Sequence, residues 1–236
     1  MLVASFVYAS VGHGGASAYI AAMALAGIAP QEMRPVALFL NILVSALATY
    51  KFHRAGHFRW RLFWPFAATS IPLAFVGGAL TLPGNAYRVL VGVVLVYAGW
   101  QLWLSGRRGE EMREVREAPL WIAMPVGALL GILSGLTGVG GGIFLSPLLL
   151  MLGWAGTKQT SAVAAPFILV NSIAALAAGS MAKELALPGY AFALAAVVLV
   201  GGWLGAEYGA QRFANPVVRR ALAVVLAVAG AKMVLV

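Results

Sequence analysis

The residues best suited to bind a small ligand are two clusters of glycine inside apolar segments, VGHGGAS at 11–17 and GLTGVGGGIF at 135–144. A glycine inside a helix costs about 1 kcal/mol relative to alanine, so each cluster predicts a break in its helix. A glycine turn that opens a helix presents N–H donors and the positive end of the helix dipole, which suits a small anion. The predicted anion cradle consists of Gly12, Gly14, Gly15, Gly138, Gly140, Gly141 and Gly142.

Polar residues near the clusters could complete the pocket. Thr160 and Ser161 follow the second cluster, and Asn41 and Asn171 each lie within an apolar run. An asparagine in a spanning helix contacts either a ligand or a neighbouring helix, where a hydrogen bond is worth about 0.6 to 2 kcal/mol. The sequence leaves both roles open for the two asparagines.

Two residues are candidates for carrying a coupling proton. His13 is the only histidine within an apolar run, and Glu207 is the only acid within one. Histidine changes charge near neutral pH, and an intramembrane carboxylate is a functional hypothesis by default. The alternatives are a structural histidine and an interfacial ion pair of Glu207 with Arg212. No acid lies near the glycine clusters, which favours an anion over a cation as the ligand.

The elements that position these residues must lie in a membrane. Of 236 residues, 62% are hydrophobic and 10% charged, whereas soluble domains are roughly half apolar and about a quarter charged. The net charge of +9 is spread over connections between apolar runs, which fits the positive-inside rule better than nucleic-acid binding. The runs lie at 1–27, 35–50, 62–83, 89–104, 119–154, 161–181, 190–209 and 217–236.

The chain is predicted to be an all-α polytopic protein built from two repeated halves. GHGGASAYIAAMALAG (12–27) matches GVGGGIFLSPLLLMLG (138–153), and Asn41 aligns with Asn171 in a second matching pair. We therefore expect a first transmembrane repeat at 1–104, a polar cytoplasmic linker at 105–118 and a second repeat at 119–236. Each four-segment half begins with a helix broken at its glycine-rich motif.

The basic residues help to choose between two topologies. If all eight runs cross the membrane, ten Lys and Arg lie on one side and six on the other. If 1–27 and 119–154 turn back as re-entrant hairpins, the halves are inverted and the division becomes twelve against four. The second division is sharper, so we favour inverted halves, with the eight-crossing arrangement as the alternative.

Several features together resemble the TauE/SafE sulfite exporter family over about residues 8 to 236. They are G-x-G-G-G before an apolar run and Pro147, the Thr160-Ser161 pair, Asn171 and the basic aromatic connection KFHRAGHFRWRL. The resemblance implies a secondary carrier in the bacterial inner membrane, with sulfite, sulfonates or related small anions as substrates. The first half departs from the second, since His13 stands opposite Val139 and the Thr-Ser pair has no counterpart near Pro35.

The leading hypothesis is a secondary transporter that holds a small anion between two broken helices. No cofactor or metal is expected, and GxxxxGK[ST] is absent from the sequence. The expected partners are the anion and the lipid bilayer, without nucleic acid, and a homo-oligomer is left open. The alternatives are a non-transporting membrane scaffold or, less well supported, an intramembrane enzyme, for which the protease motifs are absent.

Overall fold

A computed structural model describes residues 1–105, 118–181, 187–211 and 216–235. Over this part of the chain the protein is all helical, as the composition predicts. The helices are α1 (Leu2–Ala9), α2 (Ala16–Leu25), α3 (Pro30–Arg54), α4 (Trp60–Ala79), α5 (Gly84–Ser105), α6 (Leu120–Thr137), α7 (Gly142–Met151), α8 (Thr157–Met181), α9 (Tyr190–Gln211) and α10 (Pro216–Leu235).

Both glycine clusters break a helix, as predicted. The first apolar run forms α1 and α2 with the break at residues 10–15, and the fifth forms α6 and α7 with the break at 138–141. Gly15 precedes α2 with φ at +98°, and Gly141 precedes α7 with φ at +77°. Such left-handed conformations strain any residue with a Cβ, so glycine is required at both turns.

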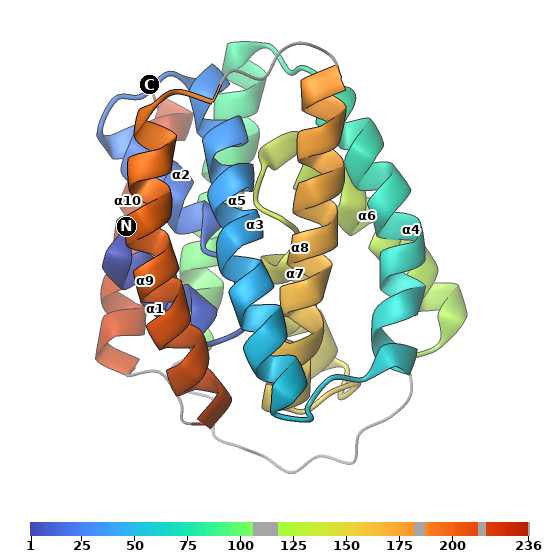
Figure 1. Cartoon of the computed structure of the whole chain (residues 1–236). Helices are drawn as coiled ribbons and strands as arrows, with labels where there is room; N and C mark the ends of the chain where they lie inside the picture. The colour runs from blue at the N-terminus through green and yellow to red at the C-terminus, as the bar shows by residue number, and fades with distance from the viewer. Residues whose placement is uncertain (106–117, 182–186, 212–215, 236) are drawn as a thin grey trace.

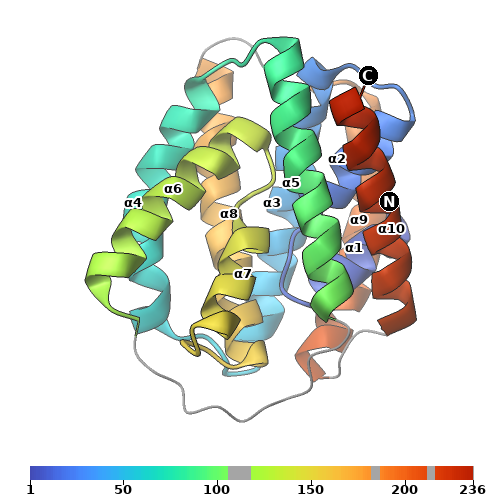
Figure 2. The ribbon, with the colours of Figure 1, turned by 180° about the vertical axis from the view of Figure 1, so that it is seen from behind.

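The broken helices fold back on themselves as hairpins. In Figures 1 and 2, α6 rises from the lower end of the molecule and α7 descends to that end, where α8 begins. The other pair is the reverse, because α1 descends and α2 rises to the upper end, where α3 begins. In Figure 1, helices α3, α4 and α5 run down, up and down in turn. Helices α8, α9 and α10 run up, down and up.

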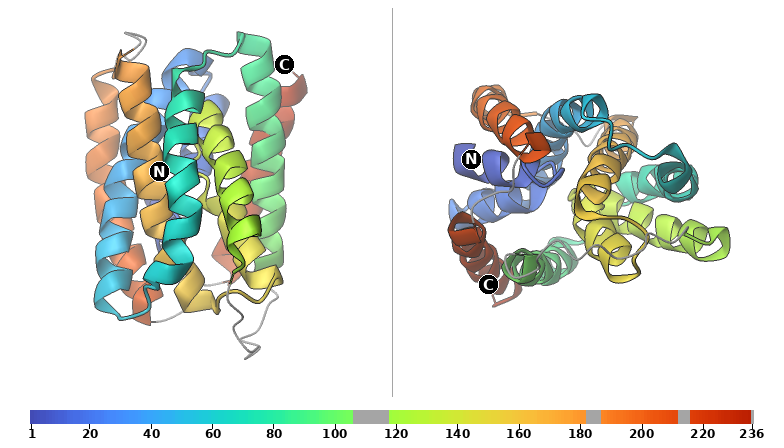
Figure 3. Two further views of the ribbon diagram at one scale, coloured as in Figure 1. Left: turned by 90° about the vertical axis from the view of Figure 1, so that its right-hand side faces the viewer. Right: turned by 90° about the horizontal axis from the view of Figure 1, so that it is seen from below.

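Helices α3 and α8 pack against each other near the centre of the molecule. Figure 3 shows α1 and α9 to one side of this pair and α4 and α6 to the other. Glycines allow the flanking pairs to approach closely: a methyl group on Gly131 of α6 would lie 2.7 Å from Ser70 Cα, and one on Gly205 of α9 would lie 2.7 Å from Phe6 Cα. Close glycine contacts of this kind are typical of helix pairs in lipid.

The outside of the bundle is apolar. Large hydrophobic side chains are exposed on different helices, including Val93, Leu129, Ile173 and Phe192. Among the described residues, five helices are long and apolar enough to cross a membrane, namely α3, α4, α6, α8 and α9. An apolar surface of this extent on long helices is stable only in lipid.

Candidate functional site

Asn41 connects the two glycine breaks at the crossing of α3 and α8. Its Oδ1 accepts a hydrogen bond from the N–H of Ala16, which opens α2, at 3.3 Å. Its Nδ2 donates to the carbonyl oxygen of Val139 in the second break at 3.4 Å and to Ser172 Oγ on α8 at 3.0 Å. The Asn41 side chain is fully buried. One side chain therefore bonds both breaks and the opposite central helix.

The break glycines lie directly against the two central helices. A methyl group on Gly14 or Gly140 would overlap the Asn41 amide. One on Gly12 would lie 2.7 Å from the Cα of Ser161, and one on Gly142 would lie 2.5 Å from Ile168 Cγ1. The glycines at these positions thus make room for α3 and α8, in addition to allowing the turns.

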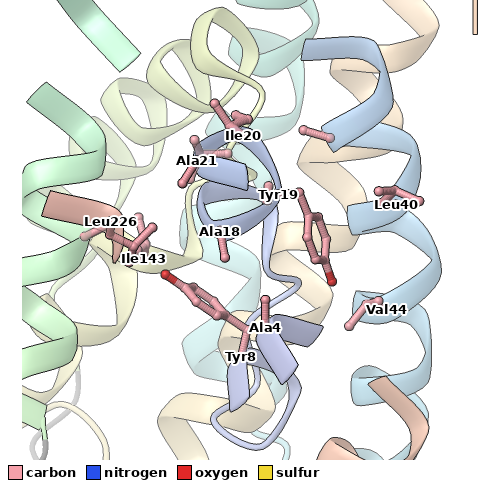
Figure 4. Packing of buried hydrophobic residues seen from close by; sticks show 14 of the residues in the cluster. Ala4, Tyr8, Ala18, Tyr19, Ile20, Ala21, Leu40, Val44, Ile143 and Leu226 are labelled. Carbon is pink, nitrogen blue, oxygen red and sulfur yellow. The ribbon is translucent and has the colours of Figure 1, made fainter. Parts of the chain in front are cut away.

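Hydrogen bonds of tyrosine stabilise the first break. Tyr19 Oη donates to the carbonyl oxygen of Gly14 at 2.9 Å, and Ser17 Oγ donates to Tyr8 Oη at 2.9 Å. Figure 4 shows Tyr8 at the end of α1, below Ala18 of α2, with Tyr19 directed toward Leu40 and Val44 of α3. His13 lies in this break with its Nδ1 3.0 Å from the carbonyl oxygen of Val11, and its ring is edge-on to Tyr8.

Four buried residues of α6, α7 and α8 carry polar side-chain atoms that have no partner in the described part of the chain. Both amide atoms of Asn171 and the hydroxyl of Thr160, two predicted site residues on α8, make no hydrogen bond in the described structure. The hydroxyls of Ser134 on α6 and Ser146 on α7 also make no hydrogen bond. A buried polar group without a partner is unusual in a folded protein and marks a place where a ligand or water can bind.

Glu207 lies apart from the breaks, near the lower end of α9. Its carboxylate forms an ion pair with Lys51 of α3 and accepts a hydrogen bond from Gln211 at 2.6 Å. The Glu207 side chain is 45% exposed, and the Lys51 ammonium also lies 3.9 Å from the centroid of the Trp203 ring. Arg212, the partner considered from the sequence, lies outside the described residues.

A cavity of about 420 Å³ opens at the upper end of the bundle. Arg34 lies in its wall and donates to the carbonyl oxygens of Leu80 at 2.9 Å and Gly77 at 3.0 Å, and to that of Gly78. These carbonyls end α4, so the guanidinium caps that helix. The cavity is lined by Pro30, Gln31, Arg34, Pro35, Leu38, Gly78, Thr81, Leu82, Gly84, Tyr87, Ala175 and Gly179.

The structure brings together most of the residues that the sequence singled out. Gly12, Gly14, Gly140 and Gly142 all lie against α3 or α8, and Asn41 contacts both breaks. The sequence argument missed Ser172, which accepts a hydrogen bond from Asn41. Its position beside Asn171 in an apolar run was the available signal. It also missed Ser134, whose unpaired hydroxyl becomes evident only in the folded chain.

The apolar helices, the exposed hydrophobic surface and the paired helix breaks define a multi-pass α-helical membrane protein. The family model of the sulfite exporter TauE/SafE matches residues 1–233. The chain belongs to this family of membrane transporters, and the resemblance noted in its motifs is confirmed.

Two curated relatives carry transporter names. The chain is 39% identical over 233 residues to the "Probable membrane transporter protein y4hK" of Sinorhizobium fredii, covering 98% of this chain and 94% of the relative. It is 25% identical over 167 residues to the "Probable membrane transporter protein ORF9" of a Sinorhizobium species, covering 68% of this chain and 64% of that relative. No solved structure matches the chain.

Proposed function

We propose that this protein is a secondary transporter of a small anion, with sulfite, a sulfonate or a related organic anion as its substrate. The observation that carries the proposal is the contact of Asn41 with both helix breaks. Transporters commonly build their sites where two discontinuous helices meet, because the half-helix ends supply charge without an ionised side chain. The family name fits a sulfur oxyanion.

The breaks suit an anion in their electrostatics. Helices α2 and α7 both begin at the breaks, so the positive ends of their dipoles lie near the α3 and α8 crossing. Backbone N–H groups at these starts are donors for oxyanion oxygens. In our proposal Gly12, Gly14, Gly15, Gly138, Gly140, Gly141 and Gly142 form the cradle, with Asn41, Thr160, Ser161 and Asn171 as polar lining.

The two halves, 1–104 and 119–236, are proposed to be inverted repeats joined by the linker 105–118. Support comes from the hairpins, which turn at opposite ends of the molecule, and from the opposite directions of corresponding long helices. The packing is also reciprocal: α1 contacts α9 as α6 contacts α4, and α3 and α8 contact each other. In inverted halves, rocking of one half against the other exposes a central site alternately to each face.

In our proposal, the proton gradient or the membrane potential supplies the energy for transport. His13 is the better placed of the two proton candidates, because it lies in the first break, whereas Glu207 is half-exposed and paired with Lys51. The proposed location is the bacterial inner membrane. The inverted hairpin topology puts twelve of the sixteen Lys and Arg on one side of the membrane. We propose that this side, the lower end with Lys51 and Lys158, faces the cytoplasm.

Transport by the purified protein in proteoliposomes tests the function. Counterflow is measured with sulfite, sulfate, thiosulfate, sulfoacetate, taurine and small carboxylates, and empty liposomes give the leak. We expect saturable counterflow for at least one anion. Folded protein that moves none of them and is stabilised by none of them would instead support the scaffold alternative.

Single cysteines test the inverted hairpin topology, because the chain contains no cysteine. Ala55→Cys and Gly156→Cys lie in exposed connections at one end of the bundle, and Ala26→Cys and Gly189→Cys at the other. Inverted halves predict that a membrane-impermeant maleimide labels the first two from one side and the last two from the opposite side. The eight-crossing arrangement pairs 55 with 189 and 26 with 156.

A further inference from the structure

Buried polar atoms without a partner are distributed unequally between the two halves. Six such side-chain atoms occur among the described residues, and five belong to Ser134, Ser146, Thr160 and Asn171 in the second half. The sixth is Thr49 Oγ1, near the lower end of α3. Because unpaired polar groups destabilise a folded protein, their concentration on α6, α7 and α8 needs a functional explanation.

The two aligned asparagines differ in their hydrogen bonding. Asn41 uses both of its amide atoms, in bonds to Ala16, Val139 and Ser172. Asn171 is equally buried and uses neither. The polar side chains at the first break are thus hydrogen-bonded within the protein, as Tyr19 and Ser17 show. By contrast, the Asn171 amide and the Ser134 hydroxyl have no partner.

Ser134 of α6 and Phe167 of α8 lie beside the start of α7, and Asn171 lies one turn along α8 from Phe167. A methyl group on Gly141 would lie 3.0 Å from Phe167 Cε1 and 3.4 Å from Ser134 Cβ. Asn171 follows Phe167 by four residues on the same face of α8, about 6 Å along the axis. Thr160 shares that face but lies about 16 Å from Asn171 along the helix, beyond the reach of the same small anion.

The upper cavity extends to within one helical turn of Asn171 along α8. Ala175 and Gly179 of α8 line it, and Ala175 is one turn beyond Asn171 on the same side of the helix. Phe167, which is fully buried, lies one turn below Asn171. Along α8, Asn171 therefore lies between the residues that line the cavity and the buried ring of Phe167.

We propose that a monovalent oxyanion is held on one side of the central crossing, by the Asn171 amide and the Ser134 hydroxyl beside the start of α7. This inference narrows the polar lining proposed above: Asn41 becomes a positioning residue that joins the breaks without contacting the anion. Both proposed ligand groups are uncharged, and neutral donors compensate one negative charge far more readily than two. This inference rests on the proposed anion transport and specifies where the anion binds.

The kinetics of matched variants test the inference in proteoliposomes, with an organic sulfonate or carboxylate that the wild type transports. Losing a hydrogen bond to a charged ligand should raise the KM of Asn171→Ala by about tenfold or more, and Ser134→Ala should act in the same direction. The melting temperature of Asn171→Ala in detergent should be unchanged or higher, because an unpaired buried amide is removed. Thr49→Val is the control and should keep the wild-type KM.

Asn41→Ala should give the opposite pattern. Its melting temperature and maximal rate fall, because three hydrogen bonds are lost, while its KM stays within about twofold of wild type. A wild-type KM in both Ser134→Ala and Asn171→Ala would overturn the site while leaving anion transport intact. If Asn171→Ala does not fold, Ser134→Ala alone decides.

The charge preference has its own measurement. Sulfate, a dianion, should compete with the transported monoanion at least about tenfold less well than methanesulfonate does. Equal competition would overturn the assignment to a monovalent ligand. A wild-type protein that transports and binds no anion would instead overturn the proposed function itself.

Discussion

Asn41 Nδ2 donates to Ser172 Oγ at 3.0 Å, and this hydrogen bond joins the two central helices, α3 and α8, at the level of the glycine breaks. Both side chains are fully buried. The same amide bonds Ala16 and Val139, so the helix crossing and the geometry of both breaks depend on one residue. A movement of α3 relative to α8 must therefore change both breaks together.

A double-mutant cycle of Asn41→Ala and Ser172→Ala measures this connection. Hydrogen bonds between spanning helices average about 0.6 kcal/mol and reach about 1.7 kcal/mol, so we expect a coupling energy in that range. The measurement is unfolding of the purified protein in mixed micelles. Strictly additive effects of the two substitutions would contradict the bond.

Gly14→Ala should strongly impair transport. The new methyl group would overlap Asn41 Oδ1 and force the amide away from Ala16. We expect at least about a tenfold loss of flux, since small displacements at a binding site cost this much or more. Gly156→Ala is the matched control, because a methyl group there meets nothing within 4 Å. Wild-type flux in Gly14→Ala would show that the first break tolerates a displaced Asn41.

Arg34→Ala should destabilise the upper end of the bundle. Its guanidinium bonds the terminal carbonyls of α4, and charged hydrogen bonds of this kind contribute about 1.5–3 kcal/mol. Arg34→Lys should recover part of the loss, because one ammonium cannot reproduce the fork of the guanidinium. The melting temperatures are compared by thermal unfolding in detergent. Equal melting temperatures for Arg34→Ala and wild type would contradict a stabilising role of the Arg34 cap.

His13→Gln tests proton coupling. If His13 takes up the coupling proton, an imposed proton gradient should no longer accelerate uptake, whereas counterflow without a gradient should continue. The same assays on Glu207→Gln should give wild-type values within about twofold, because its partly exposed ion pair with Lys51 is worth at most about 1 kcal/mol. Gradient-driven uptake that survives in His13→Gln but is lost in Glu207→Gln would reverse the assignment.

The sequence was informative about the breaks because glycine acts locally. Five glycines within residues 135–142 cannot sustain a regular helix, and the structure ends α6 at Thr137 and begins α7 at Gly142. The sequence also predicted that Glu207 lies near a helix end, because it stands close to the end of the apolar run 190–209. Its partner could not be predicted, because Lys51 lies 156 residues away on another helix and only helix packing brings them together.

Composition by itself determined a helical membrane protein, and internal similarity directed attention to two glycine clusters with aligned asparagines. Only the tertiary structure distinguished Asn41, which is fully hydrogen-bonded, from Asn171, which is buried without a partner. The two residues are identical in type and lie in similar runs. They differ because the neighbours of a buried side chain come from distant segments, here α2, the second break and α8, whose positions are set by packing.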